Sequence, residues 1–312
     1  MKVTDWLSKD EIRSLTERSD LKAAAVVAWN WALIALVFAG VATWTNPFTI
    51  VLAVIVLGGR QLGLAILMHE AGHESLFETR ELNGWLGQWL FAHPILADAE
   101  AYAASHREHH RYAGSEQDPD LPNYRAYPVS KASFARKLKR DLTGRTGTRN
   151  LVGTLSGRSA DLMMREGEKP ASRAKGLVAN GVLFAVLAIS GHAWLYLLWV
   201  IAYVTTYPLF ARIRQVAEHG NVTDLFDPDP RLHTCTTLAN PLERLVLCPN
   251  HVNYHLEHHL VAGVPTYNLE RFHRLLVERG FYRGYEASIA HGYWDVARRA
   301  VPELDRRARA AA

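Results

Sequence analysis

Long apolar runs alternate with charged stretches along this chain. The first run, Ala23–Trp44, contains 22 residues, none of them charged. As a helix rising ~1.5 Å per residue it would be ~33 Å long, enough to cross the hydrocarbon core of a bilayer. After a short turn comes a second run, Pro47–Met68, which Arg60 and Gln61 interrupt. The two runs, 23–44 and 47–68, predict a transmembrane hairpin.

A third apolar region, Gly176–Phe210, is too long for one ordinary span, because its 35 residues would form a helix of ~52 Å. We expect a break at residues 190–192, and therefore a second hairpin with spans at 176–190 and 193–212. The shorter stretch Gly84–Ala97 is apolar but cannot cross a bilayer. It suits a helix that lies in the interface or dips into it.

The placement of lysine and arginine predicts the orientation. Residues 101–175 carry fifteen of them and the chain after Gln215 carries eleven arginines, whereas the two short turns carry none. By the positive-inside rule, both termini and the central loop are cytoplasmic. The expected fold is an all-α integral membrane protein, with four transmembrane helices in two hairpins and a cytoplasmic helical cap. Its expected parts are a cytoplasmic segment (1–22), a membrane domain (23–300) and a disordered tail (301–312).

The composition mainly excludes certain partners and cofactor sites. The net charge of +4 and the pI near 9.0 follow from the cytoplasmic lysines and arginines, and no aromatic-interleaved motif suggests a nucleic-acid partner. Two cysteines, Cys235 and Cys248, cannot supply a disulfide framework, an iron–sulfur cluster or a four-cysteine zinc site. The polar start, residues 1–22, does not have the pattern of a signal peptide.

The candidate chemistry lies in histidine. Eight of the fifteen histidines fall in three five-residue windows, HEAGH, HREHH and HLEHH, which contain His69, His73, His106, His109, His110, His255, His258 and His259. Residues three or four apart share a helix face, so each window presents paired imidazoles, and the adjacent ring in HxxHH can turn toward a second ion. Imidazole suits iron, zinc, copper and nickel. Eight rings are too many for one ion, and all three windows are expected on the cytoplasmic side.

The order of these windows around two hairpins resembles the membrane fatty-acid desaturase and hydroxylase superfamily. The flanking sequences HREHHRYAGSEQDPD and YHLEHHLVAGVPTYNLERFH strengthen the resemblance, which covers about residues 30–275. It implies two iron ions held mainly by histidine, with O2 as co-substrate. It also implies His219 as a ninth ligand. Gln215 occupies a position where some members carry asparagine near the metal, and it could act there directly, through water or in helix packing.

Other polar residues receive weaker assignments. His93 and His251 are minor ligand candidates, whereas His192, His233, His273 and His291 are expected to be structural or exposed. Glu70, Glu108 and Glu257, inside the windows, could orient histidines. Arg60 is expected to snorkel or to pair, with a substrate headgroup as the alternative. Trp85, Trp89 and Tyr102 are candidate channel residues or interface anchors.

The resemblance favours a lipid desaturase, with a hydroxylase or ketolase acting on a lipid or isoprenoid as the alternative. Two readings from other classes remain: HEAGH matches the HExxH zinc-protease signature, with Glu70 as general base, and the clusters could belong to a metal transporter or store. The expected partners are a membrane lipid or acyl substrate and a separate ferredoxin or cytochrome-type electron donor. Residues 131–140 could contact an acidic donor or anionic lipid. The expected location is a bacterial inner membrane, with a cytoplasmic active site.

Overall fold

The computed structural model describes residues 1–156, 173–220 and 222–305, and in these residues it is helical apart from one pair of two-residue strands. The strands, β1 (Thr236–Thr237) and β2 (Ile289–Ala290), are parallel. The α-helices are α1 (Lys9–Thr16), α2 (Asp20–Thr43), α3 (Pro47–Gly72), α4 (Arg80–Leu86), α5 (Ala99–Tyr112), α6 (Leu121–Tyr124), α7 (Lys131–Leu142), α8 (Arg145–Ser156), α9 (Arg173–Ile189), α10 (Leu195–Val204), α11 (Thr206–His219), α12 (Pro230–His233), α13 (Pro241–Val246), α14 (His255–Leu260), α15 (Leu269–Glu278) and α16 (Tyr293–Ala300). The all-α prediction is confirmed for these residues.

Shorter helical turns connect these helices. A π-helical segment, η2 (Gly87–Ala92), follows α4. The 3-10 turns are η1 (Val3–Asp5), η3 (His93–Ile95), η4 (Pro249–His251), η5 (Thr266–Asn268), η6 (Glu286–Ser288) and η7 (Pro302–Leu304). The tail 301–312 was predicted to be disordered. Its residues Pro302–Leu304 instead form the helical turn η7, and residues 306–312 lie outside the described part of the chain.

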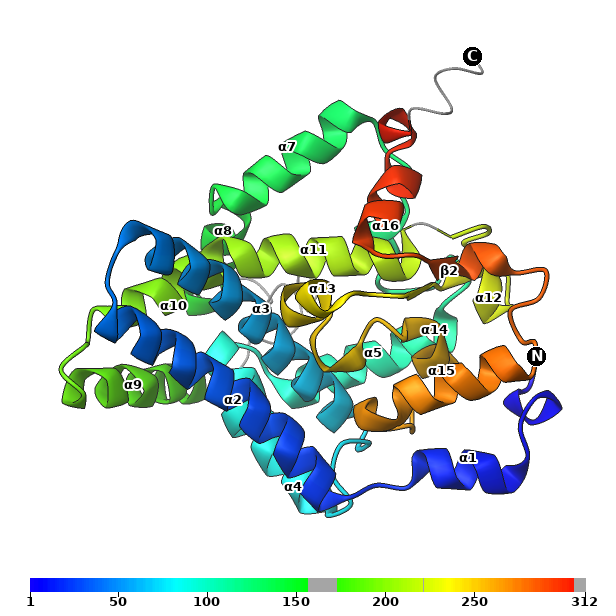
Figure 1. The fold of residues 1–312 in the computed structure, drawn as a ribbon, viewed down its shortest axis with the longest axis horizontal. Helices are drawn as coiled ribbons and strands as arrows, with labels where there is room; N and C mark the ends of the chain where they lie inside the picture. The colour runs from blue at the N-terminus through cyan, green and yellow to red at the C-terminus, as the bar shows by residue number, and fades with distance from the viewer. Residues whose placement is uncertain (157–172, 221, 306–312) are drawn as a thin grey trace.

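The hairpin of α2 and α3 forms as the apolar pattern predicts. Asn46 ends the turn between them, because its side chain accepts hydrogen bonds from the amides of Phe48 and Thr49 at 3.0 and 3.1 Å, and Pro47 suits the first helical turn. α3 then runs through the middle of the fold and packs against α2, α10, α11 and α5. Figure 1 shows α9, α10 and the turn between α2 and α3 at one end of the molecule, with α2 and α3 running from there toward the middle, and α1, α12, α14 and α15 toward the other end.

Three helical stretches in the described residues are long and apolar enough to cross a membrane: α2, α3 and Leu195–His219, which joins α10 and α11. The prediction of four membrane spans was therefore wrong, because three stretches of the described residues qualify. The predicted span 176–190 corresponds to α9, which has 17 described residues and is ~25 Å long, shorter than a hydrocarbon core of ~30 Å. The predicted span 193–212 overlaps the third stretch over residues 195–212.

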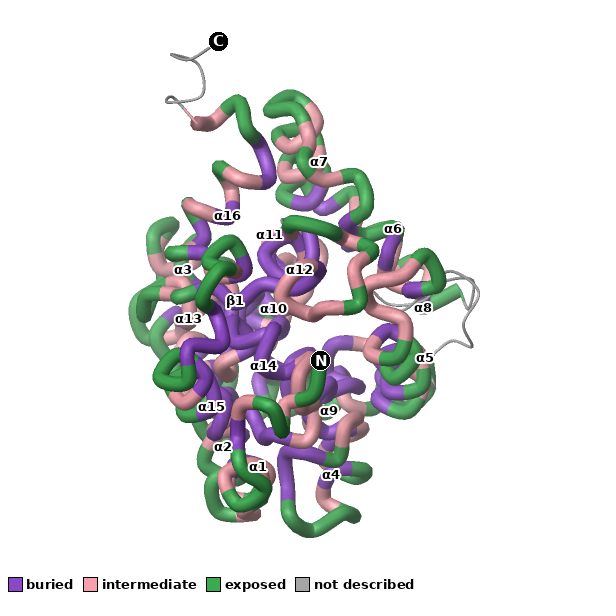
Figure 2. Tube along the Cα trace, turned by 90° about the vertical axis from the view of Figure 1, so that its right-hand side faces the viewer, coloured by how far each residue is buried: buried purple, intermediate pink, exposed green. Residues whose placement is uncertain are grey.

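The helices at this end have apolar side chains on their outer faces. Leu36 of α2 is 64% exposed, Phe48 of α3 is 74% exposed, and Ile189 of α9 is 88% exposed. A broad apolar exterior of this kind is typical of a membrane-facing surface. By contrast, residues 56–71 of α3 are buried on every side. Figure 2 shows the same division, with buried backbone in the centre and exposed residues on peripheral elements such as α1 and α7.

The N-terminal segment packs against α15. Leu7 and Leu15 are buried in one apolar cluster with Phe272 of α15. The side-chain amide of Asn268 also donates to the carbonyl oxygen of Leu15 at 2.9 Å. Residues 1–22 therefore cover α15 and help to hold the chain that follows the third histidine window.

Close packing of α3 predicts a sharp difference between two glycines. A Cβ at Gly59 would lie 2.7 Å from Val246 Cα, a backbone atom at the end of α13, whereas a Cβ at the exposed Gly40 of α2 would meet nothing within 4 Å. We expect Gly59→Ala to lower the free energy of unfolding by about 1–3 kcal/mol, because overpacking cannot relax by a side-chain rotation. Gly40→Ala should leave it unchanged or slightly raised. Unfolding titrations in detergent micelles test this, and equal stability of the two variants would contradict it.

Candidate metal centre

The nine histidines predicted as ligands lie in two neighbouring clusters. The donor atoms within each cluster lie within 4.8 Å of one another. That separation is close to twice a metal–imidazole bond of about 2.1 Å, so each cluster has the size of a metal site. The first cluster contains His69, His73, His106, His110 and His258, and the second contains His109, His219, His255 and His259.

The second and third histidine windows each serve both clusters. On α5, His106 and His110 enter the first cluster and His109 enters the second. On α14 the pattern is reversed, because His255 and His259 enter the second cluster and His258 enters the first. This follows from helix geometry: residues four apart share a face, whereas adjacent residues point ~100° apart.

Ring nitrogens face one another inside the clusters. The Nε2 atoms of His106 and His110 are 3.0 Å apart, those of His110 and His258 are 3.0 Å apart, and those of His219 and His255 are 3.0 Å apart. The buried Nε2 atoms of His69 and His73 have no hydrogen-bond partner. Converging lone pairs of this kind are favourable when a cation lies among them. The donor sets therefore fit two metal ions.

Two of the imidazoles in the first cluster show why such rings are ready to bind metal at neutral pH. Burial lowers the pKa of His73 to about 4 and the pKa of His110 to about 2, with the neighbouring positive groups acting in the same direction. Both rings are therefore uncharged at pH 7 and offer a lone pair. Neutral imidazole is the form that coordinates metal, and no proton has to be displaced first.

Hydrogen-bond partners outside the clusters determine which ring nitrogen of a histidine points into its cluster. The Nδ1–H of His69 donates to Glu70 Oε1 at 3.0 Å, and that of His109 donates to Asp118 Oδ1 at 2.8 Å. The Nδ1–H of His219 donates to the carbonyl oxygen of His233 at 3.0 Å. With Nδ1 engaged on the outside, the Nε2 lone pair faces the cluster, which is a common arrangement around protein metal sites.

Asp118 is the most important residue that sequence reasoning missed. It is 5% exposed and also accepts hydrogen bonds from the Asp120 amide at 2.8 Å and from the Tyr124 hydroxyl. Burial opposes its ionisation, but the hydrogen bond and charge interaction with His109, together with the hydrogen bonds from Tyr124 and the Asp120 amide, outweigh burial and lower the pKa of Asp118. Its sequence signal is the Asp-Pro-Asp turn that begins nine residues after His109, and we assigned that turn no role.

The glutamates of the three windows have different roles. Glu70 contacts His69 and also accepts a hydrogen bond from the Thr266 amide at 3.1 Å, so it connects the first window to the segment after the third. Glu257 is fully buried and faces away from the histidines of its own window. Its carboxylate contacts His273 Nδ1 at 2.5 Å and accepts from the hydroxyls of Tyr282 and Thr236. Glu108 is exposed on α5.

The weaker histidine candidates lie outside both clusters. His93 is buried, with Nδ1 3.2 Å from the carbonyl oxygen of Ala97, which is a structural contact. Gln215 is half-buried on α11 and makes no hydrogen bond to a cluster histidine within the described chain. Glu218, three residues after Gln215, lies beside the second cluster. Its Oε1 is 3.5 Å from His255 Nδ1 and 2.5 Å from Arg214 Nε.

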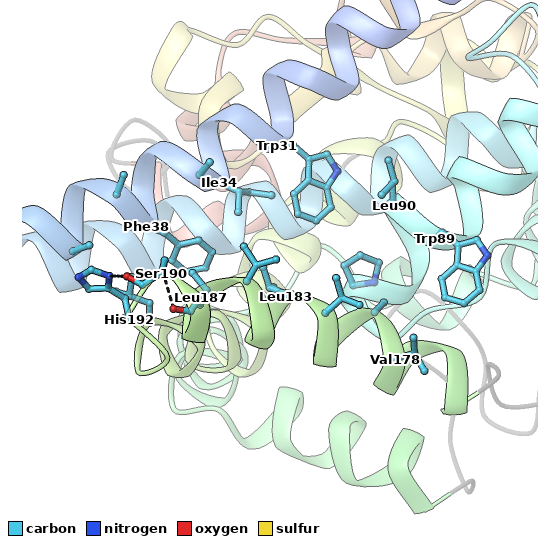
Figure 3. Close-up of a pocket in the computed structure, with 18 of the residues that line it drawn as sticks. Trp31, Ile34, Phe38, Trp89, Leu90, Val178, Leu183, Leu187, Ser190 and His192 are labelled. Carbon is cyan, nitrogen blue, oxygen red and sulfur yellow. Dashed lines mark hydrogen bonds between the residues drawn. The ribbon is translucent and has the colours of Figure 1, made fainter.

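Of two cavities in the described part of the molecule, one reaches the clusters and the other does not. A polar cavity of about 610 Å³, lined in part by His110, His233 and His259, connects both clusters to the surface. An apolar groove of about 970 Å³ lies between α2, η2 and α9, and none of the nine histidines lines it. Trp85 and Trp89 line this groove, whereas Tyr102 stacks on His106 with ring centroids 5.2 Å apart. Figure 3 shows side chains of α2 facing those of α9 across the groove.

Comparison with known proteins agrees with this geometry. The model of the fatty acid desaturase family matches residues 45–293. Dihydrorhizobitoxine desaturase of Bradyrhizobium elkanii is 28% identical over 86% of this chain and 79% of its own length. Beta-carotene ketolase of Paracoccus sp. (strain PC1) is 26% identical over 80% of this chain and 90% of its own length. The sn-1 oleoyl-lipid 12-desaturase of Anabaena variabilis is 24% identical over 78% of this chain and 74% of its own length.

The hydrogen bond to Asp118 predicts a specific loss of metal affinity. We expect Asp118→Asn to weaken binding of a divalent metal about 10–100-fold, because a neutral amide makes the His109 ring a weaker ligand than a carboxylate does. Glu116→Gln, two residues away and exposed, is the matched control and should bind as the wild type does. Metal titration of the purified protein, followed by elemental analysis, measures both. Unchanged affinity in Asp118→Asn would show that the contact does not support the site.

Proposed function

We propose, since the chain belongs to the fatty acid desaturase family, that it is an O2-dependent di-iron desaturase that introduces a double bond into a fatty-acyl chain. The observation that carries this proposal is the convergence of nine imidazoles, in groups of five and four, with their Nε2 atoms directed inward. A donor set made of neutral imidazole suits iron. Two adjacent clusters suit a pair of ions better than one.

Iron held by these residues would supply the redox chemistry by which O2, two electrons and two protons remove two hydrogens from the chain, leaving a double bond and two waters. The protein orients and protects this chemistry. Glu70, Asp118 and the carbonyl oxygen of His233 hold three rings in place. Burial of most of the cluster side chains keeps bulk water away from them.

The groove between α2 and α9 is the feature that best fits an apolar substrate. Trp31, Ile34 and Phe38 of α2 lie opposite Leu183 and Leu187 of α9, and Trp89 closes one end (Figure 3). At that end η2 packs against α5, the helix that carries the second histidine window. We propose that the groove holds part of the acyl chain while another part reaches the clusters.

We also propose the membrane placement and the source of electrons. In this placement α2, α3 and 195–219 lie in the bilayer, and α9 returns the chain through the apolar layer to the start of 195–219. The ends of α3 and α11, the clusters and the lysine- and arginine-rich segments then lie together on the cytoplasmic side. The polar cavity that reaches His110 and His259 is then an approach for a ferredoxin or cytochrome-type donor. The basic helix α7 remains a second candidate surface, for an acidic donor or for anionic lipid.

A ketolase or hydroxylase of the same superfamily is the second candidate, because one relative is named a beta-carotene ketolase and the histidine arrangement does not separate the outcomes. A zinc protease is disfavoured by Glu70. A general base needs access to a metal-bound water, whereas this carboxylate is 2% exposed and already accepts from His69, Ser75 and Thr266. A metal transporter would place its ligands near the bilayer midplane, away from the helix ends used here.

Expression in a host of defined lipid composition tests the activity. We expect the wild-type chain to convert a membrane acyl chain into a product with two fewer hydrogens, and His110→Ala to abolish this conversion. His291→Ala, an exposed histidine outside both clusters, should retain it. Mass spectrometry of total lipids measures the products. A gain of oxygen in place of unsaturation would support the ketolase or hydroxylase, and activity in His110→Ala would refute the assigned centre.

The groove assignment predicts a length-dependent defect. We expect Leu183→Trp to lower kcat/KM for long acyl chains by roughly tenfold, because the indole ring fills part of the groove. This change corresponds to ~1.4 kcal/mol of activation free energy. Leu197→Trp, at a side chain that is 59% exposed and outside the groove, is the control. Steady-state rates with a chain-length series in detergent provide the measurement. Equal rates for all chain lengths in Leu183→Trp would place the substrate elsewhere.

A further inference from the structure

Arg60, buried in the middle of α3, has no carboxylate partner. The side chain is 2% exposed. Its guanidinium donates to Asn30 Oδ1 at 3.1 Å and to the carbonyl oxygen of Leu245. No carboxylate oxygen of the described residues lies within 4.0 Å of it, and its Nε has no hydrogen-bond partner. A guanidinium stays charged, and a buried charge without a counter-charge is costly.

This arginine lines a cavity of about 730 Å³ on the flank of α2. One wall is apolar and comes from Val26 and Trp29, and the other carries Arg244 and His251. Glu270 is the only carboxylate within 4.0 Å of these two basic side chains in the described chain, at 3.5 Å from Arg244 and 3.8 Å from His251. With Arg60 added, positive charge exceeds negative charge around the cavity.

The polar wall is held in a fixed conformation. Asn250 and His251 both have left-handed backbone angles, with φ of 56° and 59°, a conformation that costs of order 1–3 kcal/mol per residue. The side chain of Asn250 is held at both ends. Its Oδ1 accepts from the Asn30 amide at 2.8 Å, and its amide donates to the carbonyl oxygen of Gly63 at 2.9 Å. The same Asn30 contacts Arg60, so the wall and the buried charge form one hydrogen-bonded unit.

We propose that this cavity binds the phosphate of a membrane phospholipid, with Arg60 and Arg244 supplying the positive charge. Guanidinium groups match the geometry of phosphate oxygens, and the buried Arg60 adds positive charge without a carboxylate counter-charge. The apolar wall fits the glycerol and first methylenes of a lipid, which a free phosphate ion would leave uncovered. Val26 and Trp29 lie six and nine residues into α2, ~9–14 Å from its start, and Trp29 is 60% exposed, as interface tryptophans are.

This inference rests on the membrane placement proposed above, but it does not depend on the metal centre. The site is built from α2, α3, α13 and η4, and none of the nine cluster histidines lines it. Metal content and lipid binding can therefore be measured separately on the same protein. A protein that lacks bound iron can still bind the lipid, and the reverse also holds.

The test uses the purified full chain in a neutral detergent, with thermal stability followed as three probes are titrated. We expect short-chain phosphatidylglycerol to stabilise the protein, and a galactolipid of the same chain length, which lacks phosphate, to have no effect. Inorganic phosphate should act only at much higher concentration. Equal stabilisation by both lipids would indicate chain binding alone and overturn the proposal. Equal affinity for inorganic phosphate and phosphatidylglycerol would overturn the assignment to a lipid.

Arg244→Gln is the decisive variant, because it removes the more exposed of the two charges and leaves every contact of Arg60 intact. We expect its apparent affinity for phosphatidylglycerol to fall about tenfold, with unchanged metal content. Arg274→Gln, on the exposed face of α15 and outside the cavity, is the matched control and should bind as the wild type does. Wild-type affinity in a folded Arg244→Gln protein would show that the cavity does not recognise the phosphate.

Discussion

Repulsion among unprotonated imidazole nitrogens is the constraint on which the centre of this structure depends. The Nε2 atoms of His106, His110 and His258 approach to 3.0 Å, and the buried Nε2 atoms of His69 and His73 have no hydrogen-bond partner. Desolvated lone pairs at this distance are unfavourable unless a proton or a cation lies between them, and burial resists protonation. The surrounding protein must therefore hold the rings in place before any ion stabilises them.

Buried hydrogen bonds, more than helix propensity, keep the histidine rings in these positions. α14 has only six residues, too few to be stable as an isolated helix, yet it carries three of the nine histidines. Glu257 fixes its rotation through His273, Tyr282 and Thr236. Since a rotation of ~100° would exchange His258 with His259, these contacts determine which ring enters which cluster.

Much of this arrangement could be predicted from sequence, because it is local. The spacing in HREHH and HLEHH defines which rings share a helix face, and the structure brings all nine expected histidines together. What could not be predicted depends on chain segments that meet only in three dimensions. Asp118 reaches His109 through an irregular turn, and Thr266 donates to Glu70 across 196 positions of sequence. No periodic pattern encodes either contact.

The error in the number of spans has the same origin. Hydropathy correctly located an apolar segment at 176–190, but hydropathy does not measure how much helix is formed, and α9 is shorter than the bilayer core in the described residues. The structure also changes the interpretation of Arg60. From sequence it could be a snorkelling side chain, which needs only a path to water. The structure instead buries it against Asn30 and the last turn of α13, where a positive charge also suits the helix dipole. Asn30 links this charge to Asn250, whose carbonyl oxygen accepts from the Thr266 hydroxyl, and Thr266 contacts Glu70 through its amide. A continuous chain of hydrogen bonds thus joins the middle of α3 to the first histidine window, so contacts within the long apolar helices also help to position the candidate metal ligands.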